Sequence, residues 1–240
     1  MMMETRNTYR DNQLGPTAQF AVSQYMSKVY MWMTLGILLT GFVAFSVANS
    51  PDVMYAIVSN KILFYGMMIA EFGLVIWLSA GINKMSPMMA TAMFLLYAAL
   101  NGATLSIFSM IYTQESIQSA FFTTAFAFAG LSGFGYVTKR DLGPIGSFCT
   151  MGLFGLFGFA ILSIFFPSMM GGMGGQIYGL VGIVVFAGLT AYDTQIIKNM
   201  APMGGSSDHV ARGAIMGALK LYLDFINLFL FILRMSGKRK

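Results

Sequence analysis

Four ionisable side chains lie well inside the long apolar segments of this sequence: Glu71, Asp193, Lys220 and Asp224. If these segments cross a membrane, a charge at the bilayer centre costs from about 2.5 kcal/mol upwards. Residues of this kind therefore have polar partners in other helices or line a path for ions or protons. We take these four as the candidates for the chemistry of the protein.

The last apolar segment carries its polar residues in a regular pattern. Gly213, Gly217, Lys220, Asp224 and Asn227 follow one another at steps of four, three, four and three, which places them on one face of a helix. The glycines allow another helix to approach closely, and Lys220 can pair with Asp224 one turn away. The pattern predicts a helix packed inside a bundle, with this face turned to a cavity or to other helices.

Asp193 lies near the end of the preceding segment, and Thr190 and Thr194 share its helical face. We predict that Asp193 and Asp224 meet across a helix interface. Two carboxylates at close range ionise together only at a large cost, so the pair retains one proton or binds a cation instead. Calcium suits these ligands, because it takes carboxylate and carbonyl oxygens. The alternative is an aspartate at the membrane surface that reaches water by itself.

Glu71 lies in the middle of the second segment, where the residues three and four positions away are apolar. It therefore needs a partner from another helix. Tyr97, Asn101 and Thr104 form a polar face on the third segment and are the expected partners. The sequence leaves open whether Glu71 makes a structural hydrogen bond or belongs to an ion path.

The composition requires an apolar environment. Hydrophobic residues make up 57% of the chain and charged residues 10%, against about 25% charged residues in a soluble domain. Lipid must therefore surround much of the surface. Cys149 is the only cysteine, which excludes an internal disulfide and a CxxC site. We expect no resident cofactor and, with the basic residues at segment ends, no nucleic-acid partner.

The apolar segments are each near the ~20 residues that cross a bilayer as a helix. They are residues 29–49, 61–82, 87–112, 117–137, 145–167, 176–198 and 212–234. We predict an all-α membrane protein, a bundle of six or seven transmembrane helices in a single domain of residues 29–236. Residues 1–28 form a polar cytoplasmic segment, and residues 237–240 form a basic tail.

Basic residues predict a cytoplasmic N-terminus. In that orientation the outer loops hold only Lys61, and the inner loops hold Lys84, Lys139, Arg140, Lys198 and Arg212. The basic residues at 234 and 238–240 break the pattern if the seventh segment crosses. The sequence leaves open whether that segment crosses or re-enters.

Three motifs resemble those of the transmembrane Bax inhibitor motif family. They are Ala191-Tyr-Asp-Thr-Gln in the sixth segment, Leu221-Tyr-Leu-Asp-Phe-Ile-Asn-Leu-Phe-Leu in the seventh and Leu95-Leu-Tyr-Ala-Ala-Leu-Asn-Gly in the third. The resemblance covers about residues 20–236, and the N-terminal layout is similar to that of bacterial members. It implies seven helices, with the last one central and wrapped by the other six.

The resemblance also implies a function. The family's paired aspartates, which match Asp193 and Asp224, are thought to form a pH-sensitive latch on a calcium leak, and Glu71 matches the acidic residue of the second span. Some members pair a basic residue after the second span with the aspartate of the sixth. The stretch Ala80-Gly-Ile-Asn-Lys84 lacks arginine, so Lys84 is the nearest candidate. Bacterial relatives have been linked to a membrane-bound protease as regulators.

Other functions fit these residues less well. An aspartyl intramembrane protease would share Tyr192-Asp193, but its second site needs Gly-x-Gly-Asp so that the substrate backbone can approach. This chain has Leu221-Tyr-Leu-Asp instead. A proton-coupled solute carrier is a further alternative, and it would require a substrate pocket. The main alternative is a regulator that transports nothing and binds a membrane protease or stress-response partner.

We therefore expect a non-enzymatic, pH-sensitive calcium leak in a bacterial inner membrane. Asp193 and Asp224 would bind the ion and form the gate. The expected partners are the lipid bilayer, calcium, protons and a membrane protein. The supporting polar residues are Glu71, Asn101, Lys220, Asn227 and Lys84.

Overall fold

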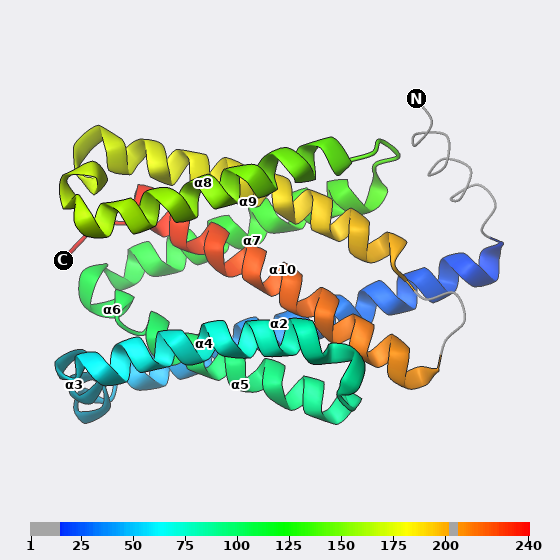
Figure 1. Ribbon diagram of the computed structural model, residues 1–240, viewed down its shortest axis with the longest axis horizontal. Helices are drawn as coiled ribbons and strands as arrows, with labels where there is room; N and C mark the ends of the chain where they lie inside the picture. Colours follow the sequence, from blue (N-terminus) through cyan, green and yellow to red (C-terminus); the bar gives the residue numbers. More distant parts are fainter. Residues whose placement is uncertain (1–14, 202–205) are drawn as a thin grey trace. The chain divides into compact units, whose positions relative to one another are not determined.

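The computed structural model describes residues 15–201 and 206–240, which form helices joined by short connections (Figure 1). In chain order the helices are α2 (Pro16–Ala48), α3 (Pro51–Ser59), α4 (Lys61–Gly81), η1 (Ile82–Lys84), α5 (Pro87–Leu105), α6 (Phe108–Ile111), α7 (Gln114–Val137), α8 (Gly143–Phe165), η2 (Pro167–Met170), α9 (Gly172–Asn199) and α10 (Ser207–Ser236). In the part of the chain described, seven helical stretches are long and apolar enough to cross a membrane. The predicted all-α membrane bundle is confirmed.

The last helix is the most enclosed of the seven. In the most apolar stretch of α10, 67% of the residues are buried, against 6% in α4. α10 is one continuous helix of 30 residues, about 45 Å long at 1.5 Å per residue. That length is sufficient to cross a hydrocarbon core. The helix therefore does not turn back within the residues it contains.

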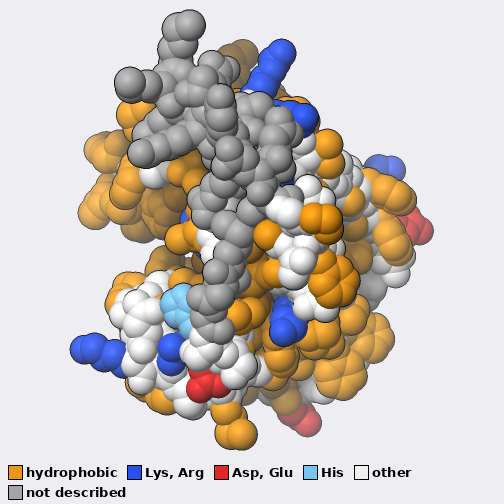
Figure 2. Space-filling model, turned by 90° about the vertical axis from the view of Figure 1, so that its right-hand side faces the viewer, with side chains coloured by type: hydrophobic (Ala, Val, Ile, Leu, Met, Phe, Trp, Pro, Cys, Tyr) orange, Lys and Arg blue, Asp and Glu red, His pale blue; other side chains and the backbone are white. Residues whose placement is uncertain are grey.

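Large apolar side chains remain exposed on the other helices. Phe42 on α2, Phe126 on α7 and Phe154 on α8 are 69%, 80% and 72% exposed. Figure 2 shows hydrophobic side chains over much of the visible face. Leaving such a side chain in water forgoes about 1.5–3 kcal/mol of burial free energy, whereas lipid tails solvate it. The protein is a multi-pass membrane protein with a lipid-facing exterior.

The contacts divide the described chain into two units. The first, the α2–α6 unit, contains Phe20–Gln114, Ala201–Tyr222 and Arg239–Lys240. The second, the α7–α9 unit, contains Glu115–Met200, Leu223–Lys238 and the described residues up to Gln19. α10 contributes residues to each unit. Within the first unit α4 packs along α5, and within the second α8 packs along α9 (Figure 1).

The first span begins at Pro16 rather than at residue 29, so α2 is longer than its apolar run. One face of this extension is buried at helical spacing, by Val22, Tyr25 and Met26. Tyr25 lies against α10: a Cβ added to Gly213 would be 3.2 Å from the tyrosine hydroxyl oxygen. A stretch of mixed polarity joins the bundle in this way, because only its buried face needs to be apolar.

α5 has a defined start and a close contact with α2. The Ser86 hydroxyl caps the helix by accepting a hydrogen bond from the N–H of Met89 (3.2 Å). Near the other end of α5, a Cβ added to Gly102 would be 2.5 Å from the carbonyl oxygen of Thr40 on α2. Glycine lets the two backbones approach, and in this arrangement the Thr40 hydroxyl donates to the carbonyl oxygen of Ala98 on α5 (2.8 Å).

Candidate functional site

Asp193 lies on α9 in the α7–α9 unit and is 8% exposed. Its neighbours Thr190 and Thr194 are fully buried, and their hydroxyls donate to the carbonyl oxygens of Phe186 (2.7 Å) and Thr190 (2.8 Å). The Thr194 hydroxyl also lies 2.8 Å from that of Ser132 on α7. The turn of α9 that carries the aspartate is thus held against α7.

Gln195 fixes the connection between α7 and α8 to α9. Its Oε1 accepts a hydrogen bond from the N–H of Leu142 (2.9 Å), and its Nε2 donates to the carbonyl oxygen of Arg140 (2.8 Å). The loop containing Lys139 and Arg140 is therefore bound to the helix that carries Asp193. A shift of this part of α9 would move the loop with it.

Asp224 lies on α10 and is 4% exposed. The next residue, Phe225, packs against Phe121 and Phe128 of α7, with ring centroids 5.8 and 5.6 Å apart. Both predicted aspartates are thus buried in the α7–α9 unit. Their direct pairing stays a prediction.

The predicted polar face of α10 has no single environment. Gly217 and Asp224 are buried, Gly213 and Asn227 are partly buried, and Lys220 is exposed. The Asn227 amide donates to a carbonyl oxygen of its own helix (2.8 Å). Apolar residues elsewhere on the helix surface are buried as well, including Ile215, Leu219 and Ile226. α10 differs from a helix with one polar and one apolar face, because it is enclosed on most sides. The pairing of Lys220 with Asp224 stays a prediction.

Glu71 is held by two of the three side chains predicted on α5, Asn101 and Thr104. Nδ2 of Asn101 donates to Oε2 of Glu71 (3.3 Å), and the Thr104 hydroxyl donates to Oε1. The Tyr222 hydroxyl on α10 donates to Oδ1 of Asn101 (3.2 Å) and lies 2.6 Å from the Thr40 hydroxyl on α2. A chain of hydrogen bonds therefore joins α4, α5, α10 and α2 within the α2–α6 unit.

Two members of this chain, Thr40 and Tyr222, were not among the residues predicted from sequence. They are 4% and 0% exposed. Buried hydroxyl groups are almost always hydrogen-bonded, so an apolar segment containing a threonine or tyrosine implies a polar partner elsewhere. Applied to every span, this rule would have added both residues to the candidates.

Lys84, the candidate partner of the sixth-span aspartate, is exposed at the end of η1. Arg212 provides a basic group at the connection between α4 and α5. Its Nη1 donates to the carbonyl oxygen of Met85 (3.1 Å). Arg212 thus ties the start of α10 to this connection, a role that the sequence did not indicate. A pairing of Lys84 with Asp193 stays a prediction.

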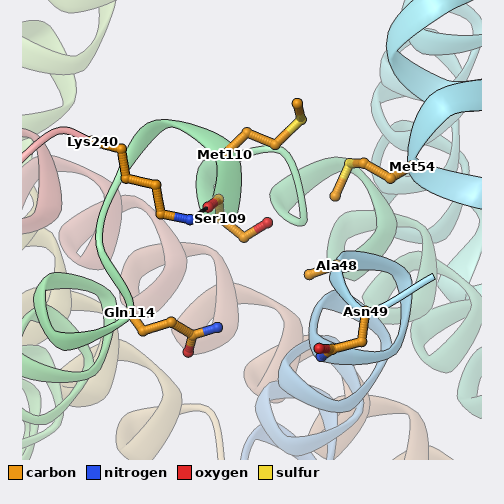
Figure 3. A pocket seen from close by; sticks show the side chains of 7 residues that line it. All are labelled: Ala48, Asn49, Met54, Ser109, Met110, Gln114 and Lys240. Atoms are coloured by element: carbon orange, nitrogen blue, oxygen red, sulfur yellow. Dashed lines mark hydrogen bonds between the residues drawn. The ribbon is translucent and has the colours of Figure 1, made fainter. Parts of the chain in front are cut away.

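Within the residues described, no three His, Cys, Asp or Glu side chains are grouped so that they could hold a metal ion. A pocket of about 300 Å³ lies in the α2–α6 unit, where Nζ of Lys240 donates to the carbonyl oxygen of Ser109 (2.6 Å) (Figure 3). Its lining residues are Ala48, Asn49, Met54, Ser109, Met110, Gln114 and Lys240. No candidate residue is among them. Among the candidate residues only Asn101, Asp193 and Asp224 are buried, and all three lie on the spans themselves.

Comparison with known proteins gives the same family over nearly the whole chain. The family described as inhibitor of apoptosis-promoting Bax1 matches residues 22–240. The inner membrane protein YbhL of Escherichia coli K12 is 46% identical over 218 residues, which cover 90% of this chain and 92% of the relative. Uncharacterised proteins of Borreliella burgdorferi and Rickettsia prowazekii are 42% identical over 219 residues (91% and 93% covered) and 36% identical over 239 residues (100% of each chain). The chain therefore belongs to the Bax inhibitor family.

Proposed function

We propose that this protein is a pH-sensitive calcium leak of a bacterial inner membrane, gated by Asp193 and Asp224. The observation that carries the proposal is the burial of both side chains, 8% and 4% exposed, within membrane spans. Carboxylates are retained at such positions at a high cost and typically serve ion or proton pathways. The family's motifs, which both aspartates match, support the same function.

The gate would respond to charge. With both carboxylates ionised, their repulsion separates them and their negative charge attracts a cation. With one proton shared between them, the repulsion is removed and a closed arrangement is stabilised. We therefore expect calcium flux to rise from acidic to basic pH.

Calcium would be the transported ion and not a resident cofactor. It takes about six to eight oxygen ligands, and two carboxylates supply fewer, so water and carbonyl oxygens would complete its shell. Conduction requires binding that is weak enough for the ion to leave. In this proposal the protein needs no cofactor and catalyses no reaction. The helix bundle is supported by the other polar residues of the spans, Glu71, Asn101, Lys220 and Asn227.

We propose that the N-terminus is cytoplasmic, because the basic loop residues then lie mostly inside. The Escherichia coli relative is named an inner membrane protein, and the same membrane is proposed for this chain. Seven crossings would place residues 237–240 outside. There the N–H of Lys238 donates to the Ser116 hydroxyl (2.9 Å), and that of Lys240 donates to the carbonyl oxygen of Ile111 (3.0 Å). These bonds hold the basic tail to the protein.

The test is calcium entry into liposomes that contain the purified protein and a trapped dye, measured from acidic to basic pH. Asp193→Asn and Asp224→Asn should lose the pH response, whereas Asp208→Asn, at an exposed position in the first turn of α10, should keep it. If folded wild-type protein gives no flux above empty liposomes at any pH, the leak is rejected. The non-transporting regulator of a membrane partner then becomes the better account.

A further inference from the structure

The hydroxyl next to Glu71 has two acceptors and one proton. Thr104 lies in hydrogen-bond contact with Oε1 of Glu71 and with the carbonyl oxygen of Leu100 (3.2 Å). A hydroxyl rotates to suit its partners and can accept a hydrogen bond while it donates another. Thr104 can therefore serve an ionised or a protonated Glu71.

The two forms of Glu71 use the same atoms in opposite directions. When Glu71 is ionised, Thr104 donates to it. When Oε1 of Glu71 carries a proton, that O–H donates to the Thr104 hydroxyl oxygen, and Thr104 donates to Leu100 instead. Nδ2 of Asn101 donates to Oε2 in both forms. Because the Thr104 hydroxyl only rotates, Glu71 and Thr104 keep a hydrogen bond to each other in both forms.

At the other end of this chain of hydrogen bonds, the hydroxyls of Thr40 and Tyr222 can also change the direction in which they donate. The Thr40 hydroxyl has one proton to donate and two hydrogen-bond partners, the carbonyl oxygen of Ala98 (2.8 Å) and the Tyr222 hydroxyl (2.6 Å). Tyr222 has one proton and can donate to Thr40 or to Oδ1 of Asn101 (3.2 Å). An ionised Glu71 polarises Asn101 and so strengthens the bond from Tyr222 to Asn101. A neutral Glu71 removes this preference, and Tyr222 can then donate to Thr40 while Thr40 donates to Ala98.

We propose that Glu71 is a reversible proton-binding site and that its occupancy sets the direction in which the Tyr222 hydroxyl on α10 donates. This site is separate from the aspartates of the proposed gate. Asp224 follows Tyr222 by two residues, a spacing that puts the two side chains on different sides of the helix. The inference goes beyond the proposed leak and does not depend on calcium passage.

The side chains near Glu71 in the α2–α6 unit are uncharged and can form hydrogen bonds. They are Tyr97, Asn101 and Thr104 of α5 and Tyr222 of α10, and Thr40 of α2 is linked to them through Tyr222. The charged residues of α4 and η1, Lys61 and Lys84, are 10 and 13 residues away, about 15 and 20 Å along a helix. On α3, Asp52 is exposed. On α10, Lys220 precedes Tyr222 by two residues and is exposed.

The protonation state of Glu71 can be followed by infrared spectroscopy, because Glu4, Glu71 and Glu115 are the only glutamates of the sequence. The full-length protein, labelled with ¹³C in the glutamate carboxyl groups, is reconstituted in lipid nanodiscs. Infrared spectra are then recorded from acidic to alkaline buffer, and the label separates glutamate bands from those of the aspartates. Glu4→Gln and Glu115→Gln assign the other two bands, and Glu71→Gln should remove the third.

The proposal expects the Glu71 band to pass fully from the protonated to the ionised form within the range where the protein stays folded. Thr104→Val should shift this band in both forms, and Thr104→Ser, which keeps the hydroxyl, should not. Tyr222→Phe should shift mainly the band of the ionised form. A Glu71 band that keeps one protonation state throughout would overturn the proposal. So would a Thr104→Val shift confined to one form. Because no ion flux is measured, these outcomes are independent of the leak.

Discussion

The carboxylates of the two units are accommodated in different ways. Glu71 lies on α4, where 6% of the most apolar stretch is buried, and donors from the adjacent helix hold it. Asp193 and Asp224 lie on α9 and α10, where 56% and 67% of that stretch is buried. On a helix that faces lipid, a carboxylate needs fixed partners. On enclosed helices the surrounding bundle itself keeps lipid away from a carboxylate.

The largest effect on stability is expected for Asn101→Leu. This change removes a donor to Glu71 and the acceptor for Tyr222, so it should lower the free energy of unfolding by about 3 kcal/mol. Denaturant or thermal unfolding in detergent measures it. Asn227→Leu is the matched control, because that amide donates only to its own helix in the bonds described and should cost less than about 1 kcal/mol. Equal costs would contradict the role given to Asn101.

Gly102→Ala tests whether the close approach of α2 and α5 positions the chain of hydrogen bonds. A Cβ would lie 2.5 Å from the Thr40 carbonyl oxygen and 2.9 Å from Cβ of Val43. We expect a loss of about 1–3 kcal/mol, seen as a lower unfolding temperature. Gly158→Ala on α8, with no atom within 4 Å of the added Cβ, should be neutral or stabilising by up to about 1 kcal/mol. A harmless Gly102→Ala would show that the two helices can separate freely.

Tyr222→Phe and Thr194→Val compare one interhelical hydroxyl in each unit. Phenylalanine keeps the ring contacts with Phe94 and Tyr97, at 5.8 and 5.7 Å between centroids, and loses only the hydroxyl. Each variant should cost about 1 kcal/mol in unfolding experiments. Only Tyr222→Phe should change the infrared band of Glu71. A matching change in Thr194→Val would mean that the two units do not act separately on their carboxylates.

The smallest effect is expected for Lys220→Gln. The side chain is exposed, and exposed substitutions usually change stability by less than about 0.5 kcal/mol. Thermal unfolding in detergent is again the measurement. A loss of several kcal/mol would show that Lys220 contributes more to the stability of the fold than its exposure indicates.

The sequence predicted the number and approximate bounds of the spans well, because uncharged runs near the ~20-residue length have few other interpretations. It was less informative where polar residues lie within a helix. The extension of α2 to Pro16 is held by three buried residues among exposed ones, and α3 (Pro51–Ser59) is too short to cross a bilayer. Both depend on contacts with other segments, which periodicity alone does not reveal.

The candidate site was predicted in part. The partners of Glu71 on α5 followed from their shared helical face, and the burial of Asp193 and Asp224 followed from their positions in apolar runs. Thr40, Tyr222 and Arg212 were missed because each acts on a helix far away in sequence. The exposure of Lys220 was also unexpected. Residue spacing gives the face of one helix, but the neighbours of that face depend on the whole bundle.

The most direct test of the central claim is a double-mutant cycle on calcium flux in liposomes. Wild type, Asp193→Asn, Asp224→Asn and the double variant are measured across the same pH series. If the two carboxylates form one gate, each single variant loses the pH response, and the double variant is no different from either. Independent effects that add in the double variant, or single variants that keep the wild-type pH response, would contradict the account.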